Sequence, residues 1–140
     1  MRAKPVMNTR LLLFALIPAL LTLANCFGDE EFVFEGTVSI EAQDSSLVIF
    51  NQTNATIYYW AIEREAMIFF DWRPCDDPDK CSGLAIKPVY SKEIPHTSIA
   101  GWKPGAEVLV YLWYLVESPS SDSGYRVEGL PRQTVDIPLE

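Results

Sequence analysis

Short apolar runs, separated by turn-forming residues about every 8 to 15 positions, follow one another from residue 32 onward. Within the first run, Val38 and Ile40 alternate with Thr37, Ser39 and Glu41, which is typical of a half-buried strand. Such spacing favours two packed β-sheets. We therefore expect residues 32–140 to form an all-β domain, an antiparallel two-sheet sandwich of seven to eight strands, immunoglobulin-like or fibronectin III-like.

The expected strands cover residues 32–42, 47–50, 56–65, 67–72, 84–90, 107–116, 125–130 and 134–137. Residues 57–62 are apolar at both odd- and even-numbered positions, so both faces of a strand there would be buried, which predicts a central strand. A helix is the alternative for residues 61–70, but the aromatic residues that continue to Trp72 favour strands. Residues 51–54 are predicted to form a turn and residues 73–83 an irregular loop, and Pro88 is expected at a sheet edge or a bulge.

The first 25 residues have a different pattern, basic at the start, then apolar, then small. Arg2, Lys4 and Arg10 precede an apolar run over residues 11–24. A helix of that length would rise about 21 Å, short of the ~30 Å hydrocarbon core of a bilayer. Residues 1–25 are therefore predicted to be an export signal rather than a transmembrane span.

The apolar run ends in Leu23-Ala24-Asn25-Cys26, which resembles the lipobox of bacterial lipoproteins. The resemblance covers only the leader and Cys26. It implies cleavage before Cys26, acylation of that residue and attachment to a membrane of the cell envelope. Phe27, rather than Asp, follows the acylated residue and indicates the outer membrane rather than the inner one. Residues 26–31 then form a tether. The alternative is an ordinary secretory signal and a soluble secreted protein.

The charge of the chain restricts its partners. Eleven basic and nineteen acidic side chains give a formal net charge of −8 and a pI near 4.6. Loss of the leader would remove three basic residues and no acidic one, leaving −11. Such a chain has no basic stripe for nucleic acid and repels anionic headgroups. Membrane attachment is therefore expected through the lipid, with an envelope protein or a glycan as the other partner.

Two further cysteines, Cys75 and Cys81, lie in an acidic loop. In an exported chain whose Cys26 is acylated they form an even pair, which predicts a disulfide rather than a thiol metal site or a redox pair. Calcium is the alternative use of the carboxylates at Asp71, Asp76, Asp77 and Asp79. Their order does not match a calcium loop, so we expect no metal and no cofactor.

Two of the expected strands carry aromatic residues at a period of two. Tyr58 and Trp60 share one strand face, and Tyr111 and Trp113 share another. Exposed together, the four rings would form a flat platform for sugar rings, which makes a carbohydrate-binding module the alternative function. Filling of a sandwich core is the other interpretation of the same four residues.

Little in the sequence points to catalysis. His96 is the only histidine, and no Gly-x-Ser-x-Gly motif occurs. Glu63 and Glu65 lie two positions apart, about 7 Å along a strand, but with no pocket implied we expect them to face solvent. The sequence therefore predicts a non-catalytic binding or structural module of the envelope and not an enzyme.

Overall fold

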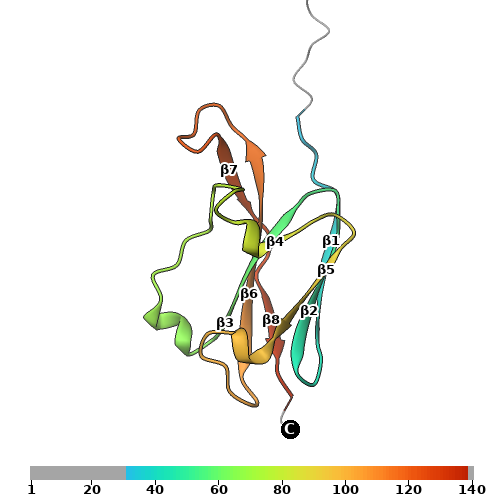
Figure 1. Ribbon diagram of the computed structural model, residues 1–140, viewed down its shortest axis with the longest axis vertical. Coiled ribbons are helices and arrows are strands. Elements are labelled where there is room, and N and C mark those ends of the chain that lie inside the picture. Colours follow the sequence, from blue (N-terminus) through green and yellow to red (C-terminus); the bar gives the residue numbers. More distant parts are fainter. Residues whose placement is uncertain (1–30, 139–140) are drawn as a thin grey trace, which may run out of the picture. The chain divides into compact units, whose positions relative to one another are not determined.

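The computed structural model describes residues 31–138, and it confirms the all-β sandwich (Figure 1). In that part of the chain eight strands and three short 3-10 turns occur, with no α-helix. The strands are β1 (Gly36–Ala42), β2 (Ser46–Thr53), β3 (Ile57–Glu63), β4 (Ala85–Ile86), β5 (Ser91–Pro95), β6 (Glu107–Glu117), β7 (Tyr125–Gly129) and β8 (Gln133–Asp136). The 3-10 turns are η1 (Ala66–Phe69), η2 (Ser82–Leu84) and η3 (His96–Ser98).

All strand pairs are antiparallel and form two sheets. One sheet has the order β1-β2-β5, and the other has the order β4-β3-β6-β7, with β8 also paired to β6. The two antiparallel sheets pack face to face as an all-β sandwich. β7 and β8 pair with successive halves of β6, and Pro131 lies between them. Because proline cannot donate to the ladder, this long edge strand is interrupted there.

The main core lies between the two sheets. Alternate residues of β3 and β6 point inward and meet the inward side chains of β1, β2 and β5. The most buried members are Leu47, Ile49, Ile57, Val108 and Val110. The alternation recognised in the sequence thus sets which face of each strand enters the core.

Asn51 explains why β2 continues where a turn was expected. Its buried side-chain amide donates hydrogen bonds to the carbonyl oxygens of Ala55 and Ile86, both at 2.8 Å. Its carbonyl oxygen accepts from the backbone N–H and the hydroxyl of Thr53. The amide therefore ties the end of β2 to β4 and completes its hydrogen bonds inside the protein.

Two predicted strands differ from the structure, and one strand was not predicted. The strand expected at 67–72 is wrong, because η1 and an extended segment occupy those residues. The strand expected at 84–90 shrinks to β4, since Pro88 opens a turn over residues 87–90. β5 was not expected, because Pro95 and the surrounding polar residues hide its single buried position, Ile94.

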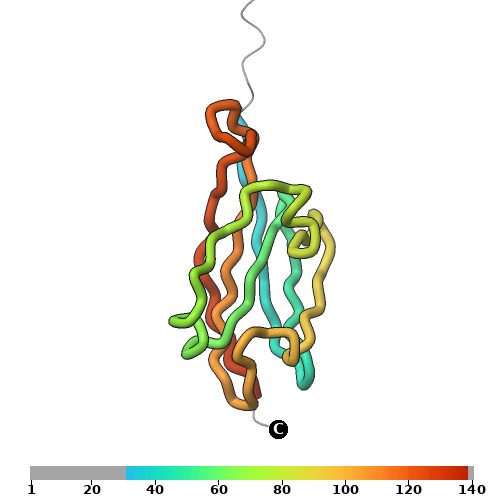
Figure 2. Tube along the Cα trace, turned by 60° about the vertical axis from the view of Figure 1, so that its left-hand side comes forward, coloured from blue at the N-terminus to red at the C-terminus, as the bar shows by residue number. Residues whose placement is uncertain are grey.

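The topology defines two ends of the sandwich. Residues 33–35, where the chain enters it, lie beside Asn54, near the start of β3. β3 then runs to Glu63, so that the loop of residues 64–84 begins at the opposite end. Figure 2 shows this loop returning along the sheet toward the first end. We call these the entrance end and the far end.

The predictions for residues 1–30, namely the signal peptide, the acylated Cys26 and most of the tether, lie outside the described residues. Within residues 31–138 no helix has the length and hydropathy needed to cross a bilayer.

Candidate functional site

The four aromatic residues singled out in the sequence lie together on the outer face of the β3–β6 sheet. Tyr58 lies directly opposite Trp113, and Trp60 lies directly opposite Tyr111. The stacked rings of the first pair have centroids 6.0 Å apart, and those of the second pair are 5.8 Å apart. Because their neighbours in sequence point into the main core, these side chains form a second cluster outside it.

Loop 64–84 contributes another aromatic ring to this cluster. Trp72 stacks on Trp60 with a centroid distance of 4.6 Å and an interplanar angle of 6°. It also meets Tyr111 at 5.0 Å and the edge of Trp113 at 5.4 Å. This role of Trp72 was not predicted, because Trp72 ends the strand expected at residues 67–72. The signal available in the sequence was the short distance along the chain between Trp72 and the aromatic residues Tyr58 and Trp60.

The side chains of the aromatic cluster are buried to different degrees. Trp113 and Tyr58 are buried, and removal from water raises the pKa of the Tyr58 hydroxyl, with a smaller contribution from Tyr125. Trp60, Trp72 and Tyr111 are half-buried. The guanidinium of Arg132 lies 5.9 Å from the centre of the Tyr111 ring. The loop thus covers one side of the rings and leaves the edges of three of them accessible.

The predicted disulfide is confirmed. Cys75 and Cys81 are bonded to each other, and Cys81 is fully buried against the aromatic cluster. The indole N–H of Trp113 donates to the carbonyl oxygen of Cys75 at 2.9 Å. The disulfide therefore fixes the loop to the central strand β6 as well as closing its own small ring.

One carboxylate of the same loop, that of Asp77, interacts with the backbone of the loop and with a neighbouring lysine. Asp77 accepts the backbone N–H of Asp79 and pairs with Lys80 at 3.0 Å. The hydrogen bond from Lys80 is the main cause that lowers the pKa of Asp77. Across residues 31–138, no three His, Cys, Asp or Glu side chains converge as metal ligands.

The start of loop 64–84 forms an apolar projection at the far end. Ile68 and Phe69 are each 81% exposed and Phe70 is 50% exposed, and η1 contains no buried residue. We call these three residues the apolar tip. Three adjacent apolar side chains on a soluble surface typically mark a contact with another molecule.

Several contacts hold the base of the apolar tip in place. The buried Glu63 carboxylate accepts the backbone N–H of Ala66 at 2.8 Å, and the Tyr111 hydroxyl meets the Met67 sulfur at 2.8 Å. Phe70 packs edge-on against Trp60. A Cβ on Gly101, whose φ is +76°, would lie 2.4 Å from the Ala66 side chain, so only glycine fits beside η1. The tip is thus supported from β3 and β6.

Charged side chains around the base of the tip are paired with one another. Lys103 lies 2.6 Å from Glu65, and Arg64 pairs with Glu107. Both pairs are largely exposed, so they contribute little to stability, but they leave an apolar centre with a polar surround. Recognition surfaces of proteins commonly have this arrangement.

The residues considered for catalysis make separate structural contacts. Glu63 is buried, contrary to the expectation that it faces solvent, because its carboxylate completes the hydrogen bonds of the turn that starts η1. Glu65 is exposed and paired with Lys103. His96 is buried and stacks against Trp102, with ring centroids 6.0 Å apart.

Comparisons of the chain with protein-family models, with curated proteins and with solved structures found no match.

Proposed function

We propose that this protein is a lipoprotein of the bacterial cell envelope, attached through acyl chains on Cys26, whose sandwich is a non-catalytic binding module. The anchor is supported by the leader and by Leu23-Ala24-Asn25-Cys26. Several acyl chains hold a protein on a bilayer almost permanently, each buried methylene contributing about 0.8 kcal/mol. Phe27 supports the outer membrane as the destination.

The binding role rests on one observation, the apolar tip that η1 presents at the far end of the sandwich. The proposed partner is an envelope protein with an apolar recess that accepts Ile68 and Phe69. The rim of paired charges around the tip fits such docking, because buried apolar centres with polar rims are typical of protein interfaces.

The anchor is tested by mass spectrometry of protein extracted from membranes. We expect a mass equal to residues 26–140 plus acyl chains, less two hydrogens for the disulfide. Cys26→Ser should move the protein to the soluble fraction. A Cys26→Ser protein that still fractionates with membranes in processed form would contradict the anchor.

The docking role is tested with a photocrosslinking amino acid placed at Ile68 in living cells. We expect one discrete adduct, whose partner is then identified and purified. The purified partner should bind the unmodified lipoprotein and lose at least tenfold in affinity for the Ile68→Ser/Phe69→Ser variant. A matched variant at the other end, Val89→Ser/Tyr90→Ser, should bind it as before. Equal binding by both variants would reject the apolar tip as the docking site.

A glycan is the second candidate ligand, and the half-buried edges of Trp60, Trp72 and Tyr111 beside Arg132 favour it. Stacking of a sugar on an indole should change the tryptophan emission during titration with oligosaccharides from the envelope. Arg132→Ala should then weaken binding several-fold. Absence of any emission change at millimolar sugar would remove this candidate.

A further inference from the structure

A strained turn lies at the entrance end, opposite the apolar tip. Residues 87–90 form a turn that the backbone N–H of Tyr90 closes onto the carbonyl oxygen of Lys87. Pro88 and Val89 occupy its two central positions, and Val89 has a φ of 62°. Glycine or asparagine usually fills this left-handed position, whereas a β-branched residue there is a clear outlier.

Backbone hydrogen bonds to Asn51, from the N–H of Val89 and to the carbonyl oxygen of Tyr90, hold the turn, but its side chains do not pack into the domain. Val89 is 86% exposed and the neighbouring Tyr90 is 65% exposed, so the side chains gain little from the fold. Strained residues persist where the surrounding structure holds them, and they are found most often at functional sites. The turn presents an apolar side chain and an amphipathic aromatic one side by side.

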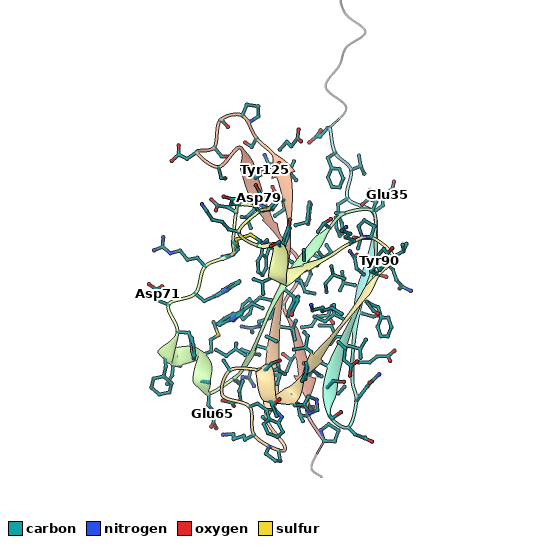
Figure 3. All side chains as sticks on the ribbon, viewed as in Figure 1. Glu35, Glu65, Asp71, Asp79, Tyr90 and Tyr125 are labelled. Atoms are coloured by element: carbon teal, nitrogen blue, oxygen red, sulfur yellow. A yellow bond between two sulfur atoms is a disulfide. The ribbon has the colours of Figure 1, made fainter. Side chains whose placement is uncertain are left out.

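The position of the turn relates it to the segment that precedes the sandwich. The Asn54 side chain accepts from the backbone N–H of Glu35 at 2.9 Å and donates to the carbonyl oxygen of Val33 at 2.8 Å. The chain therefore enters the sandwich at a fixed place. Val89 and Tyr90 hydrogen-bond to Asn51 at the same end of β2, and Figure 3 shows Glu35 and Tyr90 near each other.

The length of chain between Cys26 and the sandwich limits how far this end can be from the anchor. Val33 is the seventh residue after Cys26, so the two residues are at most about 25 Å apart when the chain between them is fully extended. The strand β6, with eleven residues, is about 36 Å long. If acyl chains on Cys26 enter a bilayer, the turn lies within reach of its surface, and the apolar tip lies farther away.

The chemistry of the turn suits the headgroup region of a bilayer. Tyrosine is favoured there because its ring is apolar and its hydroxyl stays hydrated. The charged residues near the turn are of both signs: Lys87 and Lys92 are close to it in the sequence, and Glu35 lies at the same end of the sandwich. Given the acidic chain as a whole, a zwitterionic surface fits this end better than an anionic one.

We propose that Val89 and Tyr90 contact the headgroup region of a zwitterionic phospholipid bilayer, and that this contact orients the sandwich with its apolar tip away from the membrane. The inference rests on the proposed acylation of Cys26, which brings the bilayer within reach. The lipid anchors the chain, and turn 87–90 sets the direction in which the module faces.

The test uses the full acylated protein on phosphatidylcholine vesicles, after mass spectrometry has confirmed the acyl chains. A fluorophore is attached at Ser91→Cys, beside the turn, or at Thr97→Cys, which is exposed in η3 at the far end. Vesicles then contain lipids with a nitroxide quencher at the headgroup. We expect quenching at position 91 to be at least twofold stronger than at position 97.

Two variants separate the turn from the anchor. Val89→Ser/Tyr90→Ser should lower quenching at position 91 to the level at position 97, while the protein remains on the vesicles. Ile68→Ser/Phe69→Ser should leave it unchanged. Tyr90→Ser alone, which retains Val89, should lower it in part and provides the test if the double variant fails to fold.

Equal quenching at positions 91 and 97 in the acylated protein would overturn the proposal, as would quenching that the double variant leaves intact. A missing acyl mass would instead contradict the anchor, and it would be recognised before any fluorescence is measured. The two failures are therefore distinguishable.

Discussion

Val89 holds a conformation that its side chain disfavours, and the strain is stored in a single residue. Asparagine adopts the left-handed region more readily because its short polar side chain bonds locally. Val89→Asn should therefore raise the free energy of unfolding by about 1 kcal/mol, and the melting temperature by about 4 °C.

Thermal unfolding followed by circular dichroism measures this change. Tyr90→Asn is the matched control, because its backbone is not left-handed and no gain is expected. If Val89→Asn melts at or below the temperature of the unmodified protein, the strain has another compensation. The same substitution should weaken the proposed bilayer contact.

The charge of the Glu63 carboxylate stabilises the turn that supports the apolar tip. The backbone N–H of Glu65 is the main cause that lowers its pKa, and Ala66 and Lys103 contribute, while burial opposes the shift. A carboxyl with a lowered folded-state pKa stabilises the fold above its ordinary pKa of 4.5. That contribution is lost as the pH falls through the lower folded-state value.

Glu63→Gln should consequently melt at a lower temperature than the unmodified protein at pH 7. The difference should shrink as the pH falls below 4.5 and through the lowered pKa of the folded state, because the native carboxylate then becomes protonated. Glu65→Gln, an exposed neighbour, provides the control and should change the profile little. A constant difference across the whole pH range would show that the charge of Glu63 is not the cause.

Loop 64–84 is the element that converts an ordinary sheet face into a candidate site. The disulfide-closed ring of seven residues from Cys75 to Cys81 anchors the loop beside Trp113, and the start of the loop carries the apolar tip. By the chain-entropy estimate, closure of so short a loop contributes about 2 kcal/mol. The disulfide thus stabilises both the fold and the cover of the aromatic cluster.

Replacement of both Cys75 and Cys81 by Ser should lower the free energy of unfolding by about 2 kcal/mol. It should also diminish the near-ultraviolet circular dichroism of the stacked Trp60 and Trp72, because Trp72 depends on the loop. Trp60→Phe with the disulfide intact should remove the same signal at a much smaller cost in stability. A full tryptophan signal in the double serine variant would mean that packing alone holds the loop.

At the scale of the whole molecule, the sandwich has two ends with different chemistry. The entrance end carries the exposed turn 87–90, and the far end carries the apolar tip. This separation follows from the direction of β3, which begins at one end and passes into loop 64–84 at the other. Under the proposed anchor, the short tether keeps the first end near the bilayer.

Lengthening the tether tests that arrangement. Insertion of about twenty Gly and Ser residues after Glu31 should leave the acylated protein on vesicles, but it should lower the effective concentration of the turn at the surface. Nitroxide quenching at position 91 should then fall at least twofold. A rigid insertion of the same length should have a larger effect. Unchanged quenching with both insertions would show that the tether length does not govern the contact.

The sequence by itself determined the fold class, because alternation along a strand decides directly which side chains are removed from water. Six of the strands follow from that pattern, and so do the shared face of Tyr58 with Trp60 and that of Tyr111 with Trp113. The disulfide was also predicted, from the even pair that Cys75 and Cys81 form when Cys26 is set aside. These features depend on neighbours in sequence.

Only the tertiary structure decided which sheet face each aromatic pair occupies and what covers it. Residues 67–72 are apolar enough for a strand, but η1 and an extended segment occupy them, and Trp72 packs on Trp60. The exposure of Ile68, Phe69 and Val89 likewise depends on segments distant in the chain. Burial is a property of contacts between such segments, and a local pattern of hydrophobic positions does not contain them.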